Sequence, residues 1–381
     1  MPAVVSLVGG ARPNFMKLAP LYRALRRCDC FDLRLVHTGQ HYDEQMAGTF
    51  FRELGLPEPH ATLHVGSGSH AAQTARLLER FEHDLRESRP DLVVVVGDVN
   101  STLACALAAA KMSYEDGRRP RIAHAEAGLR SFDRTMPEEI NRVLTDAIAD
   151  YLFVTEPAGV DNLVREGRDA DRVFLVGNLM IDTLLAHADD AIRARPWEPL
   201  GLAKQGYAVA TLHRPSNVDD PQRLAQLWQT LCAASSRLPV VFPVHPRTRA
   251  RVVAAGLAAP RTLLLCDPQP YMTFLGLLAG ARVVLTDSGG IQEETTMLGV
   301  PCLTLRENTE RPITVTLGTN RVVGNDVARI TPELDRVLAM AMPARPAPPL
   351  WDGEAATRIA QILQHEVGAG RIPSSALPAV S

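Results

Sequence analysis

Short apolar runs alternate with segments of helical spacing along the whole chain. The run "DLVVVVGD" (91–98) is apolar throughout rather than at every second position, which is typical of a strand buried on both faces. Helical segments such as "HAAQTARLLERFEHDL" (70–85) separate these runs. The strands expected in the first part are 3–9, 33–39, 91–98, 121–128 and 151–157. Strands joined by helices in this way predict a parallel sheet covered on both faces.

A second series of the same kind begins either at "VFLVGN" (173–178) or after the Pro/Trp-rich break at 194–201. Its further strands are expected at 207–213, 240–245, 262–267, 283–287 and 301–306. The pattern therefore predicts an α/β fold of two Rossmann-like domains whose parallel sheets face a central cleft. The expected boundaries are 1–172 for the first domain, 173–350 for the second, and 351–381 for a helix packing back on the first domain plus a loose tail.

Composition narrows the class of protein. The 381 residues are 46% apolar and 22% charged, and the net charge is −3. We expect a soluble cytoplasmic protein, because no run has the length of a membrane span and no basic region precedes the first apolar run. The charge argues against a nucleic-acid surface. The six cysteines show no C-x-x-C spacing, and neither a zinc pattern, a Walker loop nor G-x-G-x-x-G occurs, so we expect free thiols, no metal and no nicotinamide cofactor.

Polar clusters follow the predicted strands at their carboxyl ends, where ligands bind in open parallel sheets. Any single cluster has a plain structural explanation: Asp98 or Ser288 could cap a helix, and "PEE" (137–139) could be an ordinary helix start. Eight clusters at eight strand ends are harder to explain in this way. They occupy 9–17, 37–41, 97–102, 124–139, 212–217, 243–247, 286–294 and 306–312.

The clusters of the second half suit a diphosphate. Ser288, Gly289 and Gly290 stand where a helix begins, so its free N–H groups and dipole would face an anion. The basic candidates beside them are His213, Arg214, His245 and Arg311. Glu294, one turn into that helix, could accept hydrogen bonds from the two ribose hydroxyls of a nucleotide.

The clusters of the first half suit proton transfer. Asp98, Glu126 and Glu138 are carboxylates at strand ends, and Arg12 and Lys17 follow the first strand. The helix-start explanation accounts for one of the two adjacent glutamates at 138 and 139, but not for Glu126. Lys17 is one of three lysines in the sequence, so it is either a solvated helix residue or a lysine placed there for a specific use.

Several motifs together resemble the non-hydrolysing UDP-N-acetylglucosamine 2-epimerases. They are "GARPNFMKLAPL", "HTGQH", "GDVNSTLA", "HAEAGLRS", "MPEEINRVLTD", "HRPSN", "PVHPRT" and the long segment from "LTDSGGIQEE" to "TLGTN". The resemblance spans about residues 3 to 365. It implies the GT-B architecture, a homodimer, and interconversion of UDP-GlcNAc and UDP-ManNAc through elimination of UDP to 2-acetamidoglucal, which would supply ManNAc-type sugars for cell-surface polysaccharides.

The resemblance also implies roles for individual residues. Asp98, Glu126 and Glu138 match carboxylates tied to catalysis. Arg12, Lys17 and His213 match residues at the phosphates or needed for turnover. The segment matching the UDP site contributes Ser288, Gly289, Gly290, Glu294 and Arg311. Residues matching Gln40, His41, Arg214 and His245 bind a second UDP-GlcNAc as an activator in some bacterial members.

The sequence departs from the family pattern near the sugar. Asn14 replaces an acid, and the segment before "MPEE" lacks a Trp-Pro pair. A related UDP-2-acetamido sugar, in diacetamido or uronic acid form, is therefore a second candidate substrate. Asp43 stands where Gln is usual in the activator site, a departure that bears on activation and not on the sugar. The same motifs are also compatible with a hydrolysing epimerase, a GT-B glycosyltransferase or a catalytically inactive UDP-sugar sensor.

Overall fold

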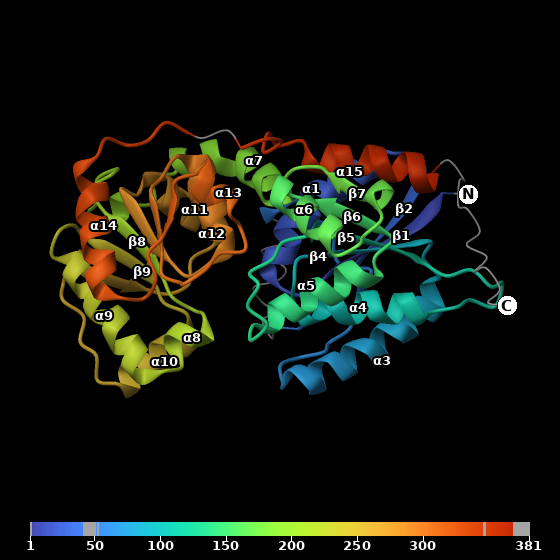
Figure 1. Ribbon diagram of the computed structural model, residues 1–381, viewed down its shortest axis with the longest axis horizontal. Coiled ribbons are helices and arrows are strands. Elements are labelled where there is room, and N and C mark those ends of the chain that lie inside the picture. The colour runs from blue at the N-terminus through green and yellow to red at the C-terminus, as the bar shows by residue number, and fades with distance from the viewer. Residues whose placement is uncertain (1, 41–50, 52, 346–347, 369–381) are drawn as a thin grey trace. The chain divides into compact units, whose positions relative to one another are not determined.

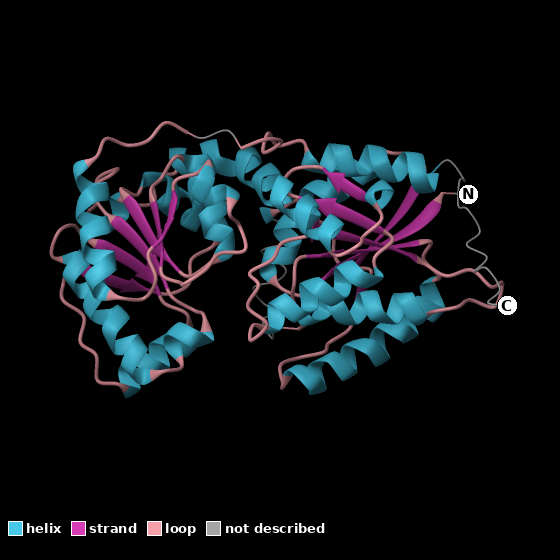
Figure 2. Cartoon of the chain, in the orientation of Figure 1, coloured by secondary structure: helices cyan, strands magenta, loops and turns pink. Residues whose placement is uncertain are grey.

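The computed structural model describes residues 2–40, 51, 53–345 and 348–368, and these form two compact units. The first unit contains the chain up to Asp182 together with the residues from Asp352 onward. The second unit runs from Thr183 to Trp351. Each unit is a parallel sheet enclosed by helices (Figure 2).

The first unit is built on a seven-stranded parallel sheet in the order β3-β2-β1-β4-β5-β6-β7. Every side chain of the central strand β4 is buried, as its unbroken Leu and Val run requires. The strands are β1 (Ala3–Gly9), β2 (Phe31–His37), β3 (Ala61–Thr62), β4 (Leu92–Val96), β5 (Arg121–Ala127), β6 (Tyr151–Val154) and β7 (Val173–Leu175).

Helices cover both faces of this sheet. In Figure 1, α3, α4 and α5 gather on one face, and α1, α6 and α15 lie on the other. Pro at the first position of α5 fits the helix start, because that position needs no amide hydrogen bond. The helices are α1 (Arg12–Arg26), α3 (His70–Ser88), α4 (Asn100–Lys111), α5 (Pro137–Ile148), α6 (Pro157–Arg165), α7 (Leu179–Arg193), α15 (Ala355–Leu363), and the short turns η1 (Ala170–Arg172) and η3 (Gln364–Gly368).

The second unit repeats the scheme with a six-stranded parallel sheet in the order β10-β9-β8-β11-β12-β13. Its strands are β8 (Ala208–Thr211), β9 (Val240–Pro243), β10 (Leu263–Cys266), β11 (Val283–Thr286), β12 (Cys302–Thr304) and β13 (Asn320–Val322). Its helices are η2 (Glu198–Leu200), α8 (Pro215–Val218), α9 (Pro221–Ser235), α10 (Pro246–Ala254), α11 (Tyr271–Gly280), α12 (Gly289–Leu298), α13 (Ile313–Thr316) and α14 (Val327–Ala339).

The predicted fold of two Rossmann-like domains is confirmed, but the boundary after residue 172 is not where the structure divides. Strand β7, at 173–175, pairs with β6 as the last strand of the first sheet. The second sheet starts at β8, after the Pro/Trp-rich break that was the other candidate. The division falls inside α7, which begins in the first unit and ends in the second.

The C-terminal helix α15 belongs to the first unit and packs against α1. Its first turn is fastened to α7, because Asp182 accepts hydrogen bonds from the Ala355 N–H at 3.2 Å and the Ala356 N–H at 2.7 Å. A carboxylate in this place satisfies helix amides that otherwise have no partner. Across the residues the structure describes, none of the helices combines the length and the apolar character needed to cross a membrane.

Candidate active site

Helix α5 presents three buried charged side chains, Glu139, Arg142 and Asp146, along its inward face. Their spacing of three and then four residues places them on one helical stripe. The side chain of Arg142 is about 1% exposed. A buried stripe of charges is costly unless each member is paired, so the partners of these residues define the site.

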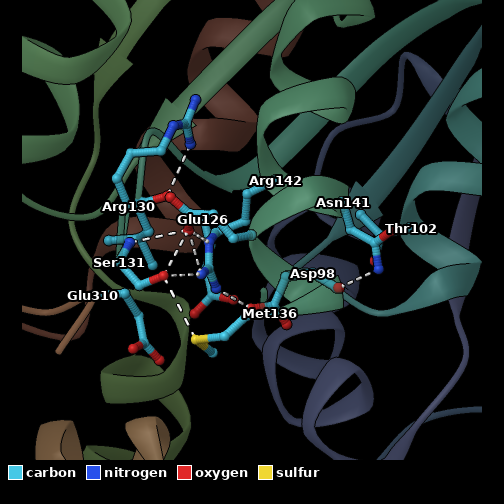
Figure 3. Close-up of polar contacts among 12 residues, drawn as sticks. Asp98, Thr102, Glu126, Arg130, Ser131, Met136, Asn141, Arg142 and Glu310 are labelled. Atoms are coloured by element: carbon cyan, nitrogen blue, oxygen red, sulfur yellow. Dashed lines mark hydrogen bonds and ion pairs between the residues drawn. The ribbon is translucent and has the colours of Figure 1, made fainter. Parts of the chain in front are cut away.

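Arg142 holds the predicted catalytic residue Asp98, which follows β4. Its Nη1 donates to Asp98 Oδ2 at 2.5 Å, and the Asn141 amide donates to the Asp98 backbone carbonyl at 2.8 Å (Figure 3). Asp98 does not cap α4: the cap position belongs to Val99. The side chain of Asp98 remains 29% exposed, so a substrate can reach the carboxylate that Arg142 orients.

Glu139 anchors the loop between β5 and α5. Its carboxylate accepts from Arg142 Nη2 at 2.6 Å, from the Ser131 N–H at 3.0 Å and from the Phe132 N–H at 2.9 Å. Burial alone would raise the pKa of Glu139, but the Ser131 N–H and Arg142 lower it below the usual range. Of the two adjacent glutamates at 138 and 139, Glu139 is therefore the one that a structural role explains. Its neighbour Glu138 is partly exposed in the first turn of α5.

Glu126 lies at the end of β5 in an uncommon conformation. Its φ is +70°, in the left-handed region that non-glycine residues seldom adopt and that clusters at functional sites. One carboxylate oxygen, Oε2, accepts a hydrogen bond from Lys17 of α1. The other, Oε1, is buried and has no hydrogen-bond partner among the described residues. The rare lysine is thus paired with a predicted catalytic carboxylate.

Gly97 makes room for this pair. It directly follows β4 with φ +70°, and a Cβ there would lie 3.3 Å from Glu126 Oε2 and 3.5 Å from Lys17 Nζ. Asn14, the departure from the family pattern, is also buried beside Gly97. Its Oδ1 accepts from the Ala11 N–H at 2.9 Å, and its Nδ2 donates to the Val96 carbonyl at 3.0 Å. An acid could not make this second bond, because it needs a donor.

In the second unit, helix α12 begins at Gly289, inside the Ser-Gly-Gly turn. Ser288 is the N-cap residue, yet its hydroxyl makes no capping hydrogen bond within the described chain. Gly289 has a packing requirement of its own. A Cβ at this position would lie 2.4 Å from Arg311 Nη1 and 2.6 Å from Glu310 Oε1, so a larger residue would have to displace this ion pair. Gly290 follows it in the first turn of α12.

Three arginines near the start of α12 lie close to the carboxylate of Glu310. Arg311 Nη1 lies 2.6 Å and Arg306 Nη2 2.8 Å from this carboxylate, and Arg214 Nη2 lies 3.7 Å away. Burial would raise the pKa of Glu310, but Arg311 and Arg306 hold it far below the usual range. Arg311 also contacts Glu293, so three arginines face two carboxylates, which leaves an excess of positive charge suited to a phosphate.

Asp287 orients the exposed His213. Its carboxylate lies 2.9 Å from His213 Nδ1, and it also accepts from the Arg214 N–H at 3.0 Å and the Asn217 amide at 3.1 Å. Burial would raise the pKa of Asp287, and His213 lowers it below the usual range. A carboxylate on Nδ1 fixes the ring so that Nε2 points away from Asp287. His245, by contrast, is the N-cap of α10, with Nδ1 accepting from the Arg247 N–H.

The adjacent carboxylates Glu293 and Glu294 have different environments. Arg311 Nε lies 2.7 Å from Glu293 Oε1, so Glu293 is charge-paired. Glu294 is buried beside Tyr271, and no salt bridge to it occurs in the described part of the chain. Burial, with the Glu293 charge next, raises the pKa of Glu294 to about 8. A buried carboxyl group held in this way suits the two hydroxyls of a ribose.

We predict that Glu294→Gln weakens UDP binding about 5- to 100-fold, because one acceptor for the ribose hydroxyls becomes a donor. Since the pKa of the free carboxyl group is about 8, wild-type binding should tighten as pH rises toward 8 and should release a proton near pH 7. Calorimetry in buffers with different heats of ionisation measures the affinity for UDP and the number of protons released on binding. UDP itself also titrates, so the variant serves as the baseline. Equal pH dependence in both proteins would contradict the assignment.

The structure brings Asp98, Glu126 and Lys17 to neighbouring strand ends of the first unit, and gathers His213, Arg214, Ser288 and Arg311 around β8, β11 and α12 of the second. Gln40 is buried and its Oε1 accepts from Ser101 Oγ at 2.7 Å. The side chain of Arg12, together with His41 and Asp43, lies outside the described residues. The sequence analysis did not single out Arg142 or Asp287. The available signal for Arg142 was the three–four spacing of charges on α5, and for Asp287 it was an acid directly before the Ser-Gly-Gly turn.

Two Rossmann-like units of this kind, with carboxylates at the strand ends of one and a helix start bordered by arginines in the other, are the arrangement of a nucleotide-sugar enzyme of the GT-B class. The UDP-N-acetylglucosamine 2-epimerase family model matches residues 23–364. The chain belongs to this family of epimerases, which are isomerases.

Two relatives and one solved structure are similar to most of this chain. UDP-N-acetylglucosamine 2-epimerase of Methanocaldococcus jannaschii is 39% identical over 370 residues, 95% of this chain and 99% of that protein. UDP-2,3-diacetamido-2,3-dideoxy-D-glucuronate 2-epimerase of Pseudomonas aeruginosa is 43% identical over 319 residues, 83% of this chain and 86% of that protein. A crystal structure of the M. jannaschii enzyme in complex with UDP-GlcNAc and UDP matches with a TM-score of 0.86 and 38% identity, covering 95% of this chain and 99% of that chain.

Proposed function

We propose that this protein is a non-hydrolysing epimerase that interconverts UDP-GlcNAc and UDP-ManNAc without a cofactor. The observation that carries the proposal is the pair of carboxylates at the ends of β4 and β5, Asp98 fixed by Arg142 and Glu126 paired with Lys17. A diphosphate site and two proton-handling groups are what inversion at C2 requires.

The chemistry follows from the weak acidity of the C2 hydrogen. A carboxylate takes the C2 proton, the C2–H electron pair forms the C1=C2 bond, and the C1–O bond breaks to release UDP with its electron pair. The cationic residues of the second unit would stabilise the charge on the leaving diphosphate. UDP then adds back to C1 of the 2-acetamidoglucal while a second group returns a proton to the opposite face of C2.

Glu126 and Asp98 are suited to these two transfers for different reasons. Glu126 keeps one buried oxygen outside its ion pair, and such an oxygen can hold or accept a proton without competition from water. Asp98 is partly exposed, so it can exchange its proton with solvent between turnovers.

The test is turnover in deuterium oxide with no nicotinamide added. UDP-GlcNAc should give UDP-ManNAc that carries deuterium at C2, with traces of 2-acetamidoglucal and UDP. Proton NMR of the products measures the label and distinguishes the candidate reactions. Free ManNAc as the main product would indicate a hydrolysing epimerase, and a requirement for added NAD would end the proposal.

A second candidate substrate is UDP-2,3-diacetamido-2,3-dideoxy-glucuronate. The relative from P. aeruginosa named for that sugar is 43% identical to this chain, against 39% for the M. jannaschii enzyme named for UDP-GlcNAc. The elimination chemistry at C1 and C2 would be the same. Offering both UDP-sugars in separate reactions and comparing kcat/KM decides between them.

We also infer that the protein works as a homodimer in the cytoplasm, where its product would feed the synthesis of cell-surface polysaccharides. Helix α5 supports self-association, since Ile140 and Leu144 on it are 43% and 46% exposed. Sedimentation analysis gives the number of copies directly.

A further inference from the structure

The fully buried histidine of β5, His124, stands two residues before Glu126 and makes two short polar contacts. Its Nδ1 lies 2.6 Å from Asp146 Oδ1 on α5, and its Nε2 lies 2.8 Å from the backbone carbonyl of Gly97. None of the chemistry described above uses this side chain.

The partners of His124 determine where its protons are. A backbone carbonyl can only accept, so Nε2 must carry a hydrogen. Asp146 Oδ2 accepts from the Gly128 N–H at 3.0 Å and lies 2.8 Å from Arg130 Nη1, contacts that suit an ionised carboxylate. Burial would raise the pKa of Asp146, but His124 and Arg130 lower it below the usual range. With Asp146 ionised, Nδ1 must carry a hydrogen as well.

Arg130 continues the network outward to Glu166, at 2.8 Å from Nε and 2.7 Å from Nη2. The side chain of Glu166 is 33% exposed, so the buried members of the network are His124, Asp146 and Arg130. The Asp146 carboxylate thus lies between the His124 ring and the Arg130 guanidinium.

The two backbone segments that His124 and Asp146 hold, at Gly97 and Gly128, lie next to the proposed catalytic carboxylates. Gly97 immediately precedes Asp98, and a Cβ on Gly97 would lie 3.3 Å from Glu126 Oε2. Gly128, held by Asp146, follows Glu126 by two residues. His124 and Asp146 therefore fasten the turn that carries Asp98 and the strained strand end that carries Glu126.

We propose that His124, held doubly protonated by Asp146 and the Gly97 carbonyl, is a positioning residue that fixes the turns of Asp98 and Glu126 and places a positive charge beside them. The proposal rests on the epimerase function proposed above.

The first test uses the wild-type protein. In nitrogen-15 NMR at neutral pH with through-bond assignment, both ring nitrogens of His124 should carry hydrogens, as the contacts to Asp146 and to the Gly97 carbonyl require. A ring with a hydrogen on only one nitrogen would overturn the proposal. This measurement involves no substrate, so it stands or fails independently of the proposed reaction.

The second test is His124→Gln, which removes the charge but keeps a donor. We expect kcat to fall about 10- to 100-fold, as misplaced catalytic groups do, with UDP affinity unchanged. The acid limb of the kcat/KM profile should move to higher pH, because nearby carboxylates lose a cation that favours their ionised form. An effect on stability alone would leave that limb in place.

Matched controls separate positioning from general damage. His83→Gln makes the same change on the exposed face of α3, and Asp84→Asn breaks a largely buried pair with Arg34 at a distance from the site. Neither should move the pH profile. If His124→Gln does not fold, the NMR measurement alone decides; if it folds with an unshifted profile, the proposal is wrong. A wild-type protein inactive on UDP-GlcNAc would count against the proposed function instead.

Discussion

Glu126→Gln should reduce epimerisation about 10²- to 10⁴-fold while UDP binds nearly as well as to the wild-type protein. The amide cannot take up a proton, and most of the UDP-binding residues proposed here belong to the other unit. Initial rates by product NMR and UDP affinity by calorimetry test the two halves of this expectation. Equal losses of turnover and of UDP affinity would contradict the division of labour between the units.

A complication is that Glu126 is the buried partner of Lys17. Removing one member of a buried pair costs about 3–5 kcal/mol, because it leaves an unpaired charge. The double variant Lys17→Met with Glu126→Gln removes both charges and should recover much of the lost stability without recovering activity. Glu82→Gln, at an exposed pair on α3, is the control for the substitution itself. Activity returning together with stability would assign Glu126 a structural role.

The second large effect is expected at Arg142. Arg142→Lys keeps the charge but loses the planar fork that binds Asp98 and Glu139 at once. We expect kcat to fall about 10²-fold, since Asp98 loses its orientation, and the protein to lose about 1–3 kcal/mol of stability because Glu139 keeps fewer donors.

Arg34→Lys is the matched control for this substitution. Arg34 also binds one carboxylate, Asp84, through two nitrogens, at 3.1 and 3.3 Å. This pair lies on β2 and α3 and touches no predicted catalytic residue. Thermal unfolding should show that both variants lose some stability. Initial rates should show that only Arg142→Lys loses turnover. Comparable kcat in both would show that Arg142 does not position Asp98.

The sequence predicted the strands well where the residues are buried on both faces. The run at 92–96 leaves no other interpretation, because its side chains have to be covered by helices. Strand β7 was harder to assign to a sheet, because the sequence "VFL" fits the end of the first series of strands as well as the start of the second. In the structure it pairs with β6 and so belongs to the first sheet. Strand β13 was missed, because Asn320–Val322 is short and begins with a polar residue.

Site residues at strand ends could be predicted, but their partners could not. Asp98 and Glu126 stand out because strand ends are where ligands bind. Arg142 is one of many arginines in the sequence, and its role depends on a hydrogen bond to a residue 44 positions away. Such contacts are fixed by how the helix packs on the sheet, and the local pattern does not contain that information.

The fastening of α15 to Asp182 has a consequence for synthesis on the ribosome. The two ends of that contact are 173 residues apart, and the whole second unit is translated between them. At about 5–20 residues per second, the first sheet would wait roughly 10–30 s with the face of α1 that receives α15 uncovered. During that interval the nascent chain exposes apolar surface that chaperones bind. A stop codon between residues 176 and 351 would therefore compromise the first unit, although every strand of its sheet had already been made.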